Sequence, residues 1–173
     1  MPKTIAYETL DLRDALDLAM LIEEEARERY EEFVAQMEST ESAEPAAFFR
    51  FMAENEAKHG SAIAERRTML FGHAPIRVDR SMLWEEEAPA YETVRAFMSP
   101  REAMEVALAA ERKAQAFFAA LVPRVTDAAV KALLEELRNE EVEHEQLVAR
   151  QLAKLPAPPP SPAADYADEP VAQ

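Results

Sequence analysis

Two short stretches of the same type have residues suited to chemistry. Glu56 and His59 are three residues apart, and so are Glu141 and His144. Residues at this spacing share one face of a helix, so each carboxylate would lie about one turn from its imidazole. Both pairs also fall within the apolar stripe of a helical pattern. Because buried carboxylate and imidazole groups cost free energy unless they are compensated, we expect each pair to bind a metal ion.

Two single glutamates interrupt the apolar stripes of two other helical stretches. Glu23 is followed seven residues later by Tyr30. Glu111 is followed at the same spacing by Phe118, with an alanine at the same intermediate position in both stretches. The single glutamate precedes the paired one by 33 residues in the first half and by 30 in the second. The chain is therefore an internal repeat, and its polar insertions would meet at one level of a helical bundle.

Together the two halves supply six inward-facing polar groups. Four buried carboxylates would repel one another, and two divalent cations would neutralise them. Oxygen and imidazole ligands suit iron or manganese, and zinc is a plausible alternative occupant. We expect the paired glutamates to bridge both ions and each single glutamate to bind one of them. The predicted metal ligands are Glu23, Glu56, His59, Glu111, Glu141 and His144.

The six residues together indicate a metal site more specifically than any one of the motifs does alone. One Glu-x-x-His in a Glu-rich helical protein is usually a chance surface match, and Glu23 or Glu111 alone would be interpreted as a solvated residue. Tyr30 lies two turns from Glu23 on the same face. It either forms a hydrogen bond beside the ligands, as a candidate catalytic group, or simply packs. His73 follows a glycine and is interpreted as a surface residue.

Composition narrows the classes of protein. The 173 residues suffice for one domain, and only 2 of them are glycine, which favours helix. A net charge of -15 argues against binding to nucleic acid or to an anionic membrane surface. The absence of cysteine excludes disulfides and thiolate metal sites. No stretch has the roughly 18 apolar residues that span a membrane, so we expect a cytoplasmic protein.

Apolar periodicity predicts an all-α fold with four long helices, over about 11–38, 45–71, 99–121 and 127–155. In the second helix Pro45 suits the first position, Leu70 belongs to the apolar stripe, and Gly72 fits the left-handed position after the end. Residues 73–98 would cross over between two helical hairpins, with a short helix near 80–87, and Trp84 would pack in the core or an interface. We expect one bundle over residues 1–155 and a disordered tail, rich in Pro and Ala, over 156–173.

The motifs resemble those of a known family. The stretch from Glu23 to Tyr30, with its Ala-Arg and Arg-Tyr pairs, is similar to the first-helix motif of rubrerythrin, and both Glu-x-x-His pairs resemble its second- and fourth-helix motifs. Over about residues 11–155 the chain thus resembles the ferritin-like superfamily. This resemblance implies a ferritin-like four-helix bundle that holds two Fe ions, forms a homodimer, and reduces peroxide or dioxygen while it oxidises Fe(II).

Two departures from rubrerythrin qualify that expectation. Ala114 stands where rubrerythrins often carry a further glutamate, which puts efficient peroxide reduction in doubt. The cysteine-bound iron module is absent, so electrons for turnover would come from a separate donor protein. Two other functions stay open: an iron-binding module for storage or delivery, and a structural or partner-binding bundle whose site is vestigial or filled by zinc.

Overall fold

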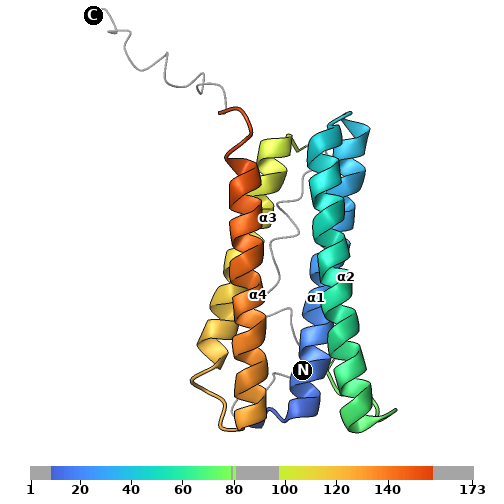
Figure 1. Cartoon of the computed structure of the whole chain (residues 1–173), viewed down its shortest axis with the longest axis vertical. Coiled ribbons are helices and arrows are strands. Elements are labelled where there is room, and N and C mark those ends of the chain that lie inside the picture. The colour runs from blue at the N-terminus through green and yellow to red at the C-terminus, as the bar shows by residue number, and fades with distance from the viewer. Residues whose placement is uncertain (1–8, 79, 81–97, 158–173) are drawn as a thin grey trace, which may run out of the picture.

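Four helices make up most of the described chain. The structure, a computed structural model, describes residues 9–78, 80 and 98–157. Figure 1 shows the helices side by side, with α1 (Leu12–Ser39) beside α2 (Ala43–Phe71) and α3 (Pro100–Leu121) beside α4 (Ala128–Leu152). The predicted all-α four-helix bundle is confirmed.

Each half of the chain forms an antiparallel hairpin, because the main helix contacts are α1 with α2 and α3 with α4. In Figure 1 the chain runs up α1 and down α2, then down α3 and up α4. Helices α2 and α3 are therefore parallel, with the end of α2 and the start of α3 at opposite ends of the bundle, as expected for two hairpins joined by a crossover. Of the short helix expected near 80–87, all but Arg80 lies outside the described residues, as do Trp84 and the expected tail beyond residue 157.

Local signals account for the helix ends. The side chains of Asp11 and Asp127 accept hydrogen bonds from backbone amides in the first turns of α1 and α4. Ser99 and Glu102 form a reciprocal capping box at the start of α3. Gly72, with a φ of 58°, ends α2 in the conformation that favours glycine. These caps provide hydrogen-bond partners for some of the backbone groups that helix ends leave unpaired.

Two details of α2 differ from expectation, and α4 is shorter than predicted. Pro45 is the third residue of α2, not the first. Proline is tolerated there because amides of the first turn need no intrahelical partner. Leu70 was predicted in the buried stripe but is 54% exposed, since the buried face of α2 ends at Arg67. Helix α4 ends at Leu152, and the chain then continues in turns.

Buried apolar side chains form two clusters, one towards each end of the bundle. On α1 the first cluster stops at Ile22 and the second begins at Tyr30. The other three helices show the same interruption, and the predicted polar residues occupy it in every case. The core therefore consists of two apolar blocks on either side of one polar layer.

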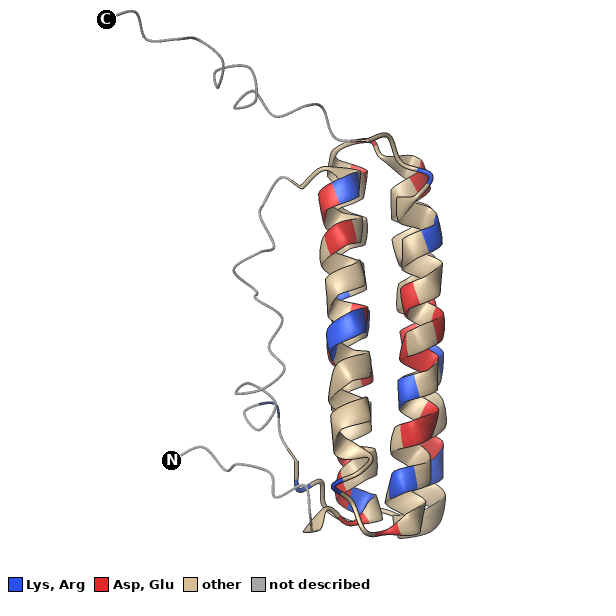
Figure 2. Cartoon of the chain, turned by 90° about the vertical axis from the view of Figure 1, so that its left-hand side faces the viewer, with Lys and Arg blue, Asp and Glu red and all other residues tan. Residues whose placement is uncertain are grey.

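A buried ion pair that the sequence did not predict joins the two helices of the first hairpin. Arg67 donates to Asp17 and also donates to the backbone carbonyl of Ala74 at 2.8 Å. These bonds hold the segment after α2 against α1. Figure 2 shows other acidic and basic residues interspersed along the helices.

Candidate metal centre

The polar layer contains all six residues that were predicted as ligands. Five of them are buried, and one comes from α1, one from α2, one from α3 and two from α4: Glu23, Glu56, Glu111, Glu141 and His144. His59 is less enclosed, with a side chain that is 29% exposed. The convergence follows from the repeat, because each helix places its polar residue in the gap between the same two apolar clusters.

His144 lies at the meeting point of three helices. Its Nδ1 is 3.2 Å from Glu56 Oε1 on α2. The same nitrogen is 3.7 Å from Glu111 Oε2 on α3 and 3.9 Å from Glu141 Oε2 on its own helix. One imidazole thus faces three carboxylates from three helices.

His59 occupies the matching place in the first hairpin. Its Nδ1 is 3.9 Å from Glu23 Oε2. The rings of His59 and His144 are stacked with centroids 5.2 Å apart and planes 7° from parallel. The two imidazoles therefore lie next to each other across the layer, each beside the single glutamate of its own half.

Several of these polar atoms lack a hydrogen-bond partner. They belong to both halves: Glu23 Oε2, Glu56 Oε1, His59 Nδ1 and His144 Nδ1. A buried polar atom without a partner costs about 1–3 kcal/mol, so four in one layer need compensation. Oxygen and imidazole nitrogen atoms are ligands for divalent transition metals. The residues therefore fit a metal centre.

The potential ligand atoms fall into three groups, each with atoms within 4.8 Å of one another. One group combines Glu56 with both histidines, and another combines Glu111 and Glu141 with His144. The third joins Glu23 and His59 to Glu140, which was not predicted as a ligand. The group of Glu23, His59 and Glu140 and the group of Glu111, Glu141 and His144 have no residue in common, so the layer offers separate ligand sets for two cations.

Burial and mutual repulsion change the protonation of the layer. Burial raises the pKa of Glu23 to about 7. Burial, followed by repulsion from neighbouring carboxylates, raises the pKa values of Glu56 and Glu141 well above their usual range. Burial also lowers the pKa values of His59 and His144. Since metal ligands must be deprotonated, cation binding would displace protons from the carboxyl groups.

Tyr30 both donates a hydrogen bond and packs, so the two interpretations left open by the sequence hold together. Its hydroxyl donates to Glu111 Oε1 across the bundle. Its ring packs against Phe33 and Phe49, with centroids 6.5 and 6.0 Å away. Burial raises the pKa of the Tyr30 hydroxyl, which keeps it protonated as a donor. Tyr30 therefore orients the carboxylate of Glu111.

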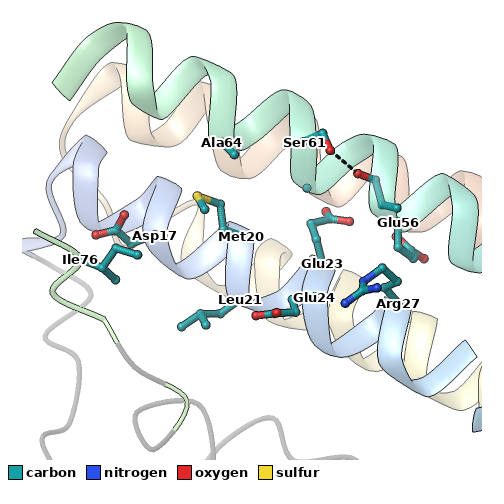
Figure 3. Close-up of a pocket in the computed structure, with 12 residues that line it drawn as sticks. Asp17, Met20, Leu21, Glu23, Glu24, Arg27, Glu56, Ser61, Ala64 and Ile76 are labelled. Carbon is teal, nitrogen blue, oxygen red and sulfur yellow. Dashed lines mark hydrogen bonds between the residues drawn. The ribbon is translucent and has the colours of Figure 1, made fainter. Parts of the chain in front are cut away.

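A pocket of about 440 Å³ lies beside the polar layer, between α1 and α2. Figure 3 shows Glu23 reaching from α1 towards α2 at this pocket. Glu23 and Glu56 form part of its wall, and the exposed residues Ser61 and Ile76 also line it, so the pocket connects the layer with solvent. The space exists because α2 carries small residues here, including Gly60 and Ala64.

A much smaller pocket, of about 40 Å³, lies beside the second half of the layer. Glu111, Glu141 and Ala114 contribute to its wall. Ala114 thus lines a void next to two predicted ligands, at the position where rubrerythrins often carry an acid.

His73, which was predicted to be a surface residue, is exposed.

Glu140 is the one member of the ligand groups that the sequence did not single out. It is partly buried, and burial followed by repulsion from Glu136 and Glu143 raises its pKa to about 7. It directly precedes Glu141 in a run of acids that also includes Glu145. The sequence alone could not distinguish it from its solvated neighbours, because its position next to His59 depends on how α4 packs against the first hairpin.

The fold and the polar layer define a class of protein, a helical bundle with buried clusters of glutamate and histidine suited to a dimetal centre. A model of the rubrerythrin family matches residues 14–152, and the chain belongs to this family. Among solved structures it is similar to an uncharacterized conserved protein from Magnetospirillum magnetotacticum MS-1. That match has a TM-score of 0.73 and 25% identity, and it covers 88% of this chain and 100% of the other.

No curated protein matches the chain. None of the helices in the described ranges is long and apolar enough to cross a membrane.

Proposed function

We propose that the protein is a di-iron oxidoreductase that reduces peroxide or dioxygen while Fe(II) is oxidised. The observation that carries this proposal is the set of unpartnered ligand atoms in the buried layer, on Glu23, Glu56, His59 and His144. Membership of the rubrerythrin family supports iron as the metal. Glu23 with His59 would hold one ion and Glu111 with His144 the other, and Glu56 and Glu141 would complete the set of ligands.

Bound as a ferrous pair, iron supplies the two electrons that, with two protons, convert one molecule of hydrogen peroxide into two of water. The protein contributes the ligands and a path for the oxidant. The pocket beside Glu23 and Glu56 admits a small oxidant, and Met20 and Leu21 give it apolar walls.

In the second half of the layer, the surrounding residues fix the position of a predicted ligand. Tyr30 holds Glu111 by a hydrogen bond and is itself fixed by the surrounding phenylalanine rings. This arrangement maintains the position of the Glu111 carboxylate. Electrons for repeated turnover would come from a separate donor protein, since the chain has no cysteine to bind a further iron centre.

Anaerobic titration of the metal-free protein with Fe(II), followed by addition of hydrogen peroxide, tests the proposal. We expect two irons to bind per chain and peroxide to produce Fe(III) absorbance rapidly. Glu56→Gln should lose this response, because it removes a buried carboxylate from the layer. Glu54→Gln is the matched control, since Glu54 is exposed on the same helix, and it should behave as wild type.

Two results would contradict the proposal in different ways. Stoichiometric iron that stays ferrous with both peroxide and air would refute the oxidoreductase function and leave the metal centre intact. Failure to bind iron stoichiometrically would refute the centre itself, and zinc binding that alters stability alone would then support a structural role.

Iron binding for storage or delivery is a second candidate function. The 29% exposure of the His59 side chain and the pocket at Glu23 favour it, because they leave one side of the centre open to exchange. Iron that transfers to a chelator without any redox change would support delivery. A shell of many subunits would support storage, whereas we expect a dimer for the oxidoreductase.

A further inference from the structure

Helix α4 directs two neighbouring carboxylates to different parts of the polar layer. Glu141 groups with Glu111 and His144, whereas Glu140 groups with Glu23 and His59. Neighbouring residues on a helix point about 100° apart, because one turn contains 3.6 residues. One helix can therefore supply a carboxylate to each half of the layer.

The two groups have the same composition. Each contains the single glutamate of one hairpin, the histidine of that hairpin and one carboxylate from α4. In each group the ligand atoms lie within 4.8 Å of one another, which is close enough to surround one cation. Glu140 thus occupies, in the first group, the role that Glu141 has in the second.

The atoms that face Glu140 need a partner that the protein does not supply. Glu23 is 3% exposed, and its Oε2 has no hydrogen-bond partner. This oxygen lies 3.9 Å from His59 Nδ1, which also lacks a partner. A cation between them would satisfy both atoms, and the carboxylate of Glu140 is within reach of the same position.

We infer that Glu140 is a seventh protein ligand and binds the cation held by Glu23 and His59. This inference rests on the dimetal centre proposed above. The chain has no acid at Ala114, beside Glu111 and Glu141, but has an additional one beside Glu23 and His59. The extra negative charge therefore lies at the more exposed of the two cation positions, where it compensates for weaker enclosure.

Anaerobic titration with Co(II), followed by visible absorption, tests the inference without any dependence on catalysis. Wild type should bind two ions per chain. Glu140→Gln should weaken one of the two by about tenfold or more and change its absorption bands, while the other ion binds as before. Glu140→Asp should also weaken that ion, because it keeps the charge but withdraws the oxygen by one methylene.

Glu143→Gln is the matched control for charge. Glu143 is exposed on the same helix and close enough to influence both Glu140 and His59, yet it belongs to none of the three ligand groups. It should change both affinities by less than about twofold, since exposed charges interact weakly through water.

Three outcomes would overturn the inference. Unchanged binding of both ions by Glu140→Gln would remove Glu140 from the ligand set and leave the dimetal centre standing. Equal weakening by Glu143→Gln would show that charge, not ligation, is the cause. Wild type that fails to bind a pair of ions would refute the proposed dimetal centre, and the seventh ligand with it.

Discussion

The first hairpin, α1 with α2, leaves its side of the polar layer open, whereas the second hairpin, α3 with α4, encloses its own. The side chain of His59 is 29% exposed and that of His144 is 5% exposed. The pocket beside Glu23 and Glu56 has a volume of about 440 Å³, and the one beside Glu111 and Glu141 about 40 Å³. The same residue types thus lie in two environments, one open to solvent and one enclosed.

Small differences within the repeat explain this contrast. When Glu56 is aligned with Glu141, the small residues Ala57 and Gly60 of α2 correspond to Val142 and Glu145 of α4. The smaller side chains leave the space that becomes the larger pocket.

The second difference between the two halves is the hydroxyl group of Tyr30. Tyr30 donates a hydrogen bond to Glu111, whereas its counterpart in the repeat, Phe118, has no donor to offer. Glu23 Oε2 accordingly lacks a hydrogen-bond partner. Modest changes in size and polarity therefore make the two halves chemically unequal.

Removal of each histidine should produce the largest difference between the halves. We expect His144→Ala to weaken binding of one Co(II) ion by about 100-fold, because it leaves a void among three buried carboxylates. His59→Ala should weaken one ion by only about tenfold, since water can reach the vacated position. Competition with a chelator measures both affinities. Equal losses, or a greater loss in His59→Ala, would contradict the proposed inequality.

Loss of the tyrosine hydroxyl should have an intermediate effect. Tyr30→Phe keeps the ring packing and removes the donor to Glu111, so the free energy of unfolding of the metal-free protein should fall by about 1.5 kcal/mol. Urea denaturation measures this change. Phe118→Tyr is the matched variant in the other hairpin, and we expect it to destabilise less than Tyr30→Phe because Glu23, the counterpart of Glu111 in the repeat, has an oxygen without a hydrogen-bond partner that could accept from the new hydroxyl. A Tyr30→Phe variant as stable as wild type would show that the hydrogen bond contributes nothing.

The pH dependence of stability should show the smallest effect. Burial raises the pKa of Glu23 from about 4.5 to about 7, and burial together with repulsion from neighbouring carboxylates raises the pKa values of Glu56 and Glu141 well above their usual range. Between pH 8 and 7 the folded metal-free protein therefore binds more protons than the unfolded chain. An excess of about one proton would increase the free energy of unfolding by about 1.4 kcal/mol as the pH falls by one unit.

This pH range isolates the carboxyl groups, because burial lowers the pKa values of His59 and His144 and both stay mainly neutral above pH 7. Urea denaturation at pH 7 and 8 measures the effect. Glu23→Gln should reduce the slope, and bound metal should reverse it, since cations and protons compete for the same oxygens. A metal-free protein that becomes more stable from pH 7 to 8 would show that the buried carboxyl groups are not protonated.

Much of the fold could be predicted from the sequence because its determinants are local. The caps at Asp11, Ser99 and Asp127 and the glycine at position 72 mark helix ends without reference to the rest of the chain. Periodicity shows which face of each helix is apolar and where a polar residue interrupts it. That information was sufficient to predict the six residues that the polar layer brings together.

The features that only the tertiary structure decided depend on contacts between helices. Periodicity places His59 and His144 on equivalent faces, but the unequal exposure of their side chains depends on the residues packed around them. The same limit applies to the Arg67 pair with Asp17, to the choice of Glu111 as the partner of Tyr30, and to Glu140. A helical pattern determines the direction in which a side chain leaves its own axis, whereas its partner is determined by how the neighbouring helices are placed.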